Sequence, residues 1–77
     1  MVDFYPNPAN TEVNILIDAN NSSYYVQIID ISGRILINEQ KSGNKSRIDI
    51  SNLETGIYIL SIRNEENQFK TFKLIKQ

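Results

Sequence analysis

The chain of 77 residues contains no cysteine, no histidine and no tryptophan, and it has only three glycines and two prolines. The absence of cysteine excludes a disulfide framework, and the absence of both cysteine and histidine excludes thiolate and imidazole metal sites. Catalytic triads that require a histidine base or a cysteine nucleophile are excluded for the same reason. We therefore predict a protein that is not an enzyme and that carries no metal and no other cofactor.

An excess of charge of one sign is also missing, since eight basic and nine acidic residues give a net charge of −1. A phosphate backbone requires a one-sided basic field, so we predict no nucleic-acid partner. No apolar run approaches the roughly 20 residues of a membrane helix, which predicts no membrane insertion. No signal-peptide pattern opens the chain. The chain is therefore either cytosolic or a piece of a longer protein whose targeting signal lies elsewhere.

Apolar residues recur with a period of two, as in a β-strand with one buried face. Val13, Ile15 and Ile17 alternate with their neighbours over the first such segment. The same period predicts further strands over residues 24–29, 35–38, 48–50, 57–63 and 68–76. Close spacing without helical segments predicts an all-β fold, an immunoglobulin-like antiparallel β-sandwich of about six to seven strands. Within it, we expect Tyr58, Leu60 and Ile62 to share one face and Phe72 and Leu74 to point inward.

Polar segments between these strands predict the turns. Asp30-Ile31-Ser32-Gly33-Arg34 is typical of a hairpin loop, in which aspartate accepts bonds from backbone amides ahead of it and glycine takes a positive φ. The remaining connections are predicted at residues 20–23, 41–46, 51–56 and 65–67, with Leu53 tucked inward. The opening Tyr5-Pro6-Asn7-Pro8 predicts a stiff, extended lead-in at a sheet edge, because proline fixes φ and lacks a donor.

In combination, these motifs resemble a known family. They are Tyr5-Pro6-Asn7-Pro8-Ala9, Asp30-x-x-Gly33-Arg34, Ile48-Asp49-Ile50-Ser51-x-Leu53-x-x-Gly56-Ile57-Tyr58-x-Leu60-x-Ile62, and Lys73-Leu74-Ile75-Lys76. Their order and spacing resemble the type A C-terminal sorting domain of the type IX secretion system (Por secretion system) of Gram-negative bacteria. The resemblance covers essentially the whole chain.

The resemblance implies a non-catalytic signal at the C-terminus of a larger secreted protein. Such domains fold in the periplasm and direct an attached cargo through an outer-membrane translocon, with a shuttle protein and a cell-surface sortase-like protease as further partners. The cargo is then attached to the cell surface or released. We accordingly expect residues 1–77 to form a single C-terminal sorting domain, a fragment whose upstream cargo is not included, in a secreted or cell-surface protein.

The family ties recognition to the C-terminal residues, which identifies candidate recognition side chains here: Lys70, Lys73, Leu74, Ile75 and Lys76. A receptor would pair with this strand and read its lysines. The alternative is that lysines on an edge strand only deter aggregation. The other family-motif residues are predicted to be structural: Tyr5, Pro6, Asn7, Pro8, Asp30, Gly33, Arg34, Leu53, Gly56 and Tyr58. A docking role for the proline segment and a surface contact by Arg34 are the alternatives.

Two other function classes stay open. A carbohydrate- or protein-binding module appended to a secreted enzyme would need an aromatic platform, for which the chain offers Tyr5, Tyr24, Tyr25 and Tyr58. A hydrolase or a calcium site would have to use carboxylates, since glycosidases pair two of them. Those closest to predicted turns are Asp18, Asp30, Asp49 and Glu54, which we expect to be solvated turn residues.

Overall fold

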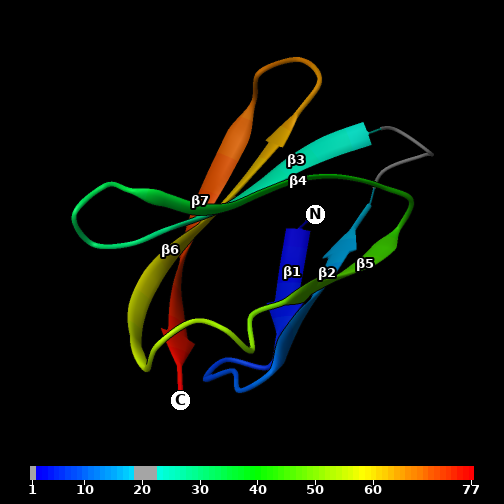
Figure 1. The fold of residues 1–77 in the computed structure, drawn as a ribbon. Coiled ribbons are helices and arrows are strands. Elements are labelled where there is room, and N and C mark those ends of the chain that lie inside the picture. The colour runs from blue at the N-terminus through cyan, green and yellow to red at the C-terminus, as the bar shows by residue number, and fades with distance from the viewer. Residues whose placement is uncertain (1, 19–22) are drawn as a thin grey trace.

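The computed structural model describes residues 2–18 and 23–77. These residues contain no helix and form the strands β1 (Val2–Tyr5), β2 (Glu12–Ile17), β3 (Ser23–Ile29), β4 (Ile35–Ser42), β5 (Lys45–Asp49), β6 (Gly56–Asn64) and β7 (Phe69–Lys76) (Figure 1). The predicted all-β fold is confirmed. Val2–Tyr5 form the short strand β1, which brings the described strands to seven. The extended lead-in predicted over residues 5–8 is correct for Tyr5 only, since residues 6–8 lie in the bend between β1 and β2.

The strands form two antiparallel sheets, one in the order β1-β2-β5 and one in the order β4-β3-β6-β7 (Figure 1). β1 is therefore an edge strand, as the two prolines that follow it predict. β7 is an edge strand of the larger sheet, and it pairs with β6 from Gly56 opposite Lys76 to Arg63 opposite Phe69. The two sheets meet face to face and give the antiparallel sandwich that the period of two predicts.

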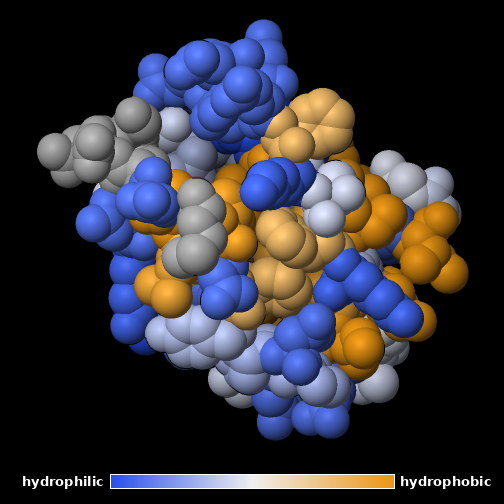
Figure 2. Space-filling view, turned by 180° about the vertical axis from the view of Figure 1, so that it is seen from behind, coloured by the Kyte–Doolittle hydropathy of each residue, from blue (hydrophilic) through white to orange (hydrophobic). Residues whose placement is uncertain are grey.

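The core lies between the sheets and takes alternate residues from both. It comprises Ala9, Val13, Ile15, Tyr24, Val26, Ile28, Ile48, Ile50, Tyr58, Leu60, Ile62 and Leu74. The predicted inward faces of the last two strands are confirmed, with Phe72 packed against this core. Figure 2 shows one face of the molecule, on which hydrophobic side chains reach the surface in a band with hydrophilic side chains above and below it.

Two side-chain contacts, one polar and one aromatic, join the two sheets. Tyr24 in β3 is 2% exposed, and its hydroxyl bonds to the Ser46 Oγ of β5 at 2.5 Å. A buried tyrosine hydroxyl needs such a partner because an unpaired polar group would have lost its water. On the other side of the sandwich, the rings of Phe4 in β1 and Phe72 in β7 lie 5.2 Å apart and close the gap between these two edge strands.

The predicted loop over residues 41–46 is wrong. β4 continues to Ser42 and β5 begins at Lys45, so Gly43 and Asn44 alone separate them. Polar residues belong to strands here because β4 and β5 are edge strands that solvent reaches, and the chain crosses between sheets at Gly43, whose φ is +88°. Of the turn predicted at residues 20–23, Ser23 begins β3, and residues 20–22 lie outside the described residues.

No helix among the described residues is long and apolar enough to cross a bilayer.

Candidate functional site

The candidate recognition residues lie on β7, and their side chains alternate between the two faces of the sheet. Leu74 is fully buried in the core and Lys76 is 7% exposed. Lys73 is exposed and Ile75 is half-buried on the outer face, which is the side of the larger sheet turned away from the sandwich. Lys70 has the parity of the inner residues but lies beyond the core and is exposed.

The five candidate residues differ in whether their side chains are accessible to a partner. The Lys76 ammonium is part-buried and donates to the carbonyl oxygen of Gln77 at 3.2 Å. The side chains of Lys76 and Leu74 are therefore inaccessible to a partner while the domain is folded. Lys70, Lys73 and part of Ile75 present side chains to solvent.

The outer edge of β7 is closed along its second half by the segment that carries the two prolines. The Asn7 carboxamide donates from Nδ2 to the Lys73 carbonyl at 3.1 Å and accepts from the Ile75 N–H at 3.0 Å. Ala9 donates its N–H to the Ile75 carbonyl at 2.7 Å and accepts from the Gln77 N–H at 2.8 Å. We call these four bonds the edge clasp. Figure 1 shows the loop between β1 and β2 beside the C-terminal end of β7.

The first half of the same edge is open. In an antiparallel pair, the N–H and C=O of alternate residues point away from the partner strand. The edge clasp uses Lys73, Ile75 and Gln77, so Phe69 and Thr71 present their backbone groups outward by the same alternation. No backbone bond to them from outside the β6–β7 pair occurs among the described residues. A strand that adds to this edge can therefore pair with residues 69–71 without opening the clasp.

The role of Asn7 was not predicted from the sequence. Its neighbours Pro6 and Pro8 were interpreted through backbone conformation alone, and both peptide bonds that precede them are cis. The available signal was chemical, because a carboxamide carries a donor and an acceptor like a peptide group and can replace a missing strand partner. What it bonds to depends on where β7 lies, which the local sequence does not indicate.

The predicted Asp30 hairpin is confirmed. Asp30 Oδ1 accepts the N–H of Ser32 at 3.0 Å and the N–H of Arg34 at 2.9 Å. A hydrogen bond from the Ser32 hydroxyl, followed by one from the Arg34 backbone, lowers the pKa of the Asp30 carboxyl below its usual 3.8. Arg34 is largely exposed and pairs with Asp30 through Nε at 3.2 Å. Gly33 has a φ of +94°, a conformation that side chains disfavour.

The other family-motif residues lie at the same end of the sandwich as the hairpin. Tyr58 is buried, and its hydroxyl donates to the Glu54 carbonyl oxygen at 2.6 Å. Leu53 packs against the core as predicted. Gly56 begins β6 opposite Lys76. Tyr5 ends β1 and is 41% exposed.

Of the carboxylates near turns, Asp30 and Asp49 accept hydrogen bonds from backbone amides. Asp49 Oδ1 accepts the Ser51 N–H at 2.9 Å, and hydrogen bonds from the Ser51 side chain and backbone lower the pKa of Asp49. Among the described residues, no three aspartates or glutamates gather into a group able to hold a metal ion.

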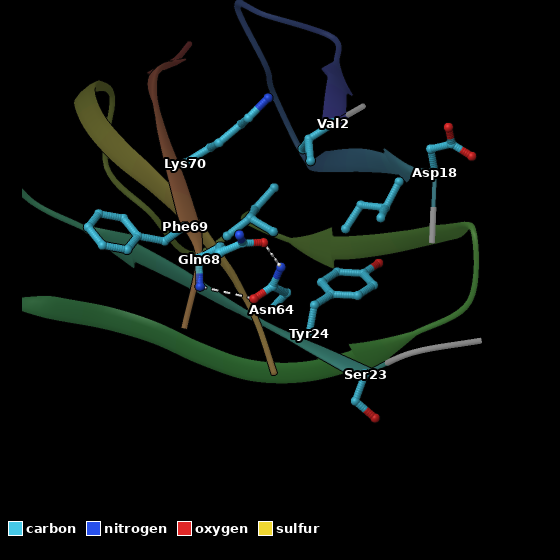
Figure 3. A pocket seen from close by; sticks show the side chains of 10 residues that line it. Val2, Asp18, Ser23, Tyr24, Asn64, Gln68, Phe69 and Lys70 are labelled. Atoms are coloured by element: carbon cyan, nitrogen blue, oxygen red, sulfur yellow. Dashed lines mark hydrogen bonds between the residues drawn. The ribbon is translucent and has the colours of Figure 1, made fainter. Parts of the chain in front are cut away.

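An open hollow lies between the sheets at the end opposite the hairpin (Figure 3). Val2 and Lys70 contribute to its rim, and Tyr24 forms part of its floor. Its amide side chains bond to each other, since Asn64 Nδ2 donates to Gln68 Oε1 at 3.0 Å and Asn64 Oδ1 accepts the Gln68 N–H at 3.0 Å (Figure 3). The Asn64 carboxamide is thus already paired within the hollow.

The described residues thus form a two-layer antiparallel sandwich with exposed faces and strand edges. A family model for secretion system C-terminal sorting domains matches residues 3–77, and the chain belongs to this family, the sorting domains of the type IX secretion system. The chain is also 39% identical over 77 residues to the ulvan lyase NLR42 of Nonlabens ulvanivorans. That alignment covers 96% of this chain and 14% of the lyase, so the chain spans about a seventh of that relative's length.

Membership of the family carries a coarse functional assignment. Its domains are secretion signals and are not catalysts, and the chain carries a sorting signal for type IX secretion. Such a signal implies the secretion machinery and an upstream cargo as partners, and it implies a secreted or cell-surface protein.

Proposed function

We propose that residues 1–77 are a single C-terminal sorting domain that directs an attached cargo from the periplasm across the outer membrane through the type IX translocon. A shuttle protein and a cell-surface sortase-like protease then act on the cargo, which is attached to the surface or released. The observation that carries this proposal is the family match over residues 3–77. The match to 14% of a much longer lyase supports it, because a small module joined to a large enzyme fits a signal and its cargo.

Within this function, β7 supplies the recognition residues Lys70, Lys73, Leu74, Ile75 and Lys76. The burial of Leu74 and Lys76 supports a division of labour, in which these two hold the strand in place and the remaining three contact the receptor. Lysines also discourage edge-to-edge aggregation, so one residue type serves both purposes.

The test is to fuse this chain to the C-terminus of a periplasmic reporter in a cell with a working type IX system. We expect the reporter in the medium or on the cell surface, and we expect it in the periplasm of a matched strain without the translocon. A protease-resistant, folded domain that holds its reporter in the periplasm of the competent strain would end the proposal.

Deletion of Phe72 to Gln77 is expected to abolish export, but the deletion also removes Leu74 from the core and breaks the edge clasp. A sharper variant therefore changes only exposed side chains. Lys70→Gln combined with Lys73→Gln should reduce export while the domain stays folded, and Lys45→Gln on β5 is the matched control. Undiminished export of the double variant would remove these lysines from the mechanism.

The alternative, a carbohydrate-binding module, gains little from the tyrosines. Tyr24 and Tyr58 are 2% and 8% exposed, so neither ring is available to stack on a sugar. Tyr25 lies on the outer face with the Arg63 guanidinium 4.9 Å from its ring centroid. Specific binding on a glycan array would favour this alternative.

A further inference from the structure

The outer face of the larger sheet has an unequal distribution of apolar side chains. At the end nearest the Asp30 hairpin it carries the isoleucine patch, which we define as Ile29, Ile35, Ile57, Ile59 and Ile75. Three of these side chains are strongly exposed: Ile35 at 51%, Ile57 at 50% and Ile59 at 39%. The opposite end of the same face carries Gln27, Ser61 and Thr71 and, beyond them, Tyr25, Arg63 and one exposed apolar residue, Phe69.

Strand pairing makes the isoleucine patch continuous. Ile29 lies opposite Ile35 on one side and opposite Ile59 on the other, so one row crosses β4, β3 and β6. Ile57 lies opposite Ile75 and two residues before Ile59, about 7 Å away on the same face. Ile31, in the adjacent hairpin, is 83% exposed and lines a shallow hollow together with Ile57.

This concentration is unusual for the chain. Among the described residues, six large hydrophobic side chains are exposed, and four of them are Ile31, Ile35, Ile57 and Ile59. The other two, Tyr5 and Phe69, lie elsewhere. Single exposed apolar residues are ordinary, but a contiguous group on a flat sheet face marks an interaction surface.

Charge on the outer face indicates what the surface binds. Lys73 lies opposite Ile59 at the border of the isoleucine patch and is exposed. No ion pair within the described part of the chain includes Lys73. Arg63 is the other charged strand residue on this face, and the strand positions here, all described, include no aspartate or glutamate. A partner with an apolar surface and a carboxylate facing Lys73 would complement the patch.

We propose that the isoleucine patch, together with Lys73, is the docking surface for a folded protein of the secretion machinery, one whose matching surface is apolar with an acidic border. This inference rests on the proposed function and specifies which surface performs it. The edge clasp supports it, because the clasp occupies both backbone groups of Ile75 and the carbonyl of Lys73, whereas the side chains of both residues point to this face and are not part of the clasp.

Other occupants fit the surface less well. A second copy of the chain would bring Lys73 and Arg63 against strand positions that carry no carboxylate. Asp30 and Glu54 line the hollow beside Ile57, and Asp30 is already paired with Arg34. Sugars are recognised by stacking on aromatic rings, and the isoleucine patch contains none. Anionic membranes attract clusters of four or more basic residues, whereas this face has two.

The test uses the reporter fusion in the type IX-competent strain with Ile57→Thr and Ile59→Thr combined. Threonine keeps the β-branched shape that strands favour and removes the apolar surface. The matched control is Phe69→Thr, which removes an exposed side chain (66%) at the other end of the face. We expect export to fall at least about tenfold for the double isoleucine variant, as for the loss of an interface hot spot, and to stay within about twofold for the control.

Three further variants and a measurement of folding separate loss of docking from loss of structure. Thermal unfolding of each purified chain shows whether the double variant is folded, and Ile35→Thr on β4 tests the patch from a different strand if it is not. Lys73→Glu should reduce export while Lys73→Arg should preserve it, since the partner's carboxylate would repel glutamate.

Each alternative outcome contradicts the inference in a recognisable way. Export of all patch variants at the wild-type level overturns the docking surface but leaves the sorting function intact, whereas retention of the wild-type fusion overturns both. Concentration-dependent dimerisation of the chain that the isoleucine substitutions abolish would assign the patch to a second copy. Binding to vesicles of anionic lipid that the same substitutions abolish would assign it to a membrane.

Discussion

The two hairpins at opposite ends of the larger sheet share one hydrogen-bond plan. Asp30–Arg34 joins β3 to β4 and Asn64–Gln68 joins β6 to β7. In both loops the first residue donates its N–H to the carbonyl of the fifth at 2.9 Å. The fourth residue donates its N–H to the carbonyl of the first, at 3.0 Å and 3.2 Å respectively.

The side chains repeat the same arrangement with different chemistry. The Oδ1 of Asn64 accepts the N–H groups of Glu66 and Gln68 at 2.9 and 3.0 Å, as Asp30 Oδ1 does for the third and fifth residues of its own loop. The fourth position has a positive φ in both, at Gly33 (+94°) and Asn67 (+63°). An oxygen at position one and tolerance of positive φ at position four therefore specify the loop, and a negative charge does not.

The largest expected difference between the hairpins is the loss of stability caused by alanine at the fourth loop position. Gly33→Ala should lower the free energy of unfolding by about 1–2 kcal/mol, because a side chain at positive φ is strained. Asn67→Ala should lower it less, because the backbone there already accommodates a side chain. Urea unfolding of both variants measures the difference, with Asn52→Ala as an exposed loop control. Equal values would show that the two loops respond to a side chain alike.

The next largest loss of stability is expected for substitution of the first loop residue. Asn64→Ala should cost about 1 kcal/mol, similar to the loss of a helix cap, since two backbone N–H groups lose their acceptor. Asn64→Asp should restore most of this loss, because it gives the hairpin the acceptor found at Asp30. If Asn64→Asp lowers the free energy of unfolding as much as Asn64→Ala does, the two loops do not have the same requirement at their first position.

The pH dependence should distinguish the hairpins more finely. The folded state lowers the pKa of Asp30 below 3.8, chiefly through the Ser32 hydroxyl, so the ionised carboxylate stabilises the fold. That contribution is fully present above the unfolded pKa and is lost as pH falls through the lower folded value. Asp30→Asn should therefore weaken the loss of stability on acidification, measured by urea unfolding between neutral pH and about pH 2.

Asp49, whose pKa is also lowered, supplies the control for that measurement. Asp49→Asn should remove a separate part of the acid sensitivity. The free energy of unfolding of the double variant should therefore depend less on pH than that of either single variant. If the free energy of unfolding of Asp30→Asn varies with pH as it does in the wild type, the charge in this hairpin does not contribute to folding stability.

The smallest effect is expected for Asn67→Gly, which gives the second hairpin the glycine of the first. Glycine relieves the positive φ but loses more chain entropy on folding, so the two terms oppose each other. We expect a change within about 0.5 kcal/mol, measured as a shift of the thermal midpoint. A larger stabilisation would mean that Asn67 is strained.

Local patterns predicted what depends on local physics. Alternation placed Tyr58, Leu60 and Ile62 on one face, and Asp30 with Gly33 predicted a hairpin; the structure confirms both. The equivalent loop at Asn64 was predicted only as a turn over residues 65–67, because asparagine at positive φ is a weaker signal than glycine.

The features that were missed depend on pairings between distant segments. The polar residues 41–42 and 45–46 belong to strands, and their strand partners lie in two different sheets. Asn7 bonds to residues 66 and 68 positions away, and the isoleucine patch combines four strands. The candidate recognition residues were identified through family resemblance. The alternation that points Leu74 inward also puts Lys76 on the inner face and Lys73 on the outer one, in agreement with their burial.

The separation of Asn7 from β7 along the chain also affects the order in which the domain is completed. The β3–β4 and β6–β7 hairpins close short loops, whereas the bonds from Asn7 join segments 66 and 68 residues apart. Loop closure costs more entropy over longer separations, so long-range contacts form more slowly than local ones. Until they form, water alone satisfies the outward backbone groups of Ile75, and the whole length of β7 can accept another strand. The interval before the chain's two end segments meet is thus the time at which this domain is most exposed to mispairing.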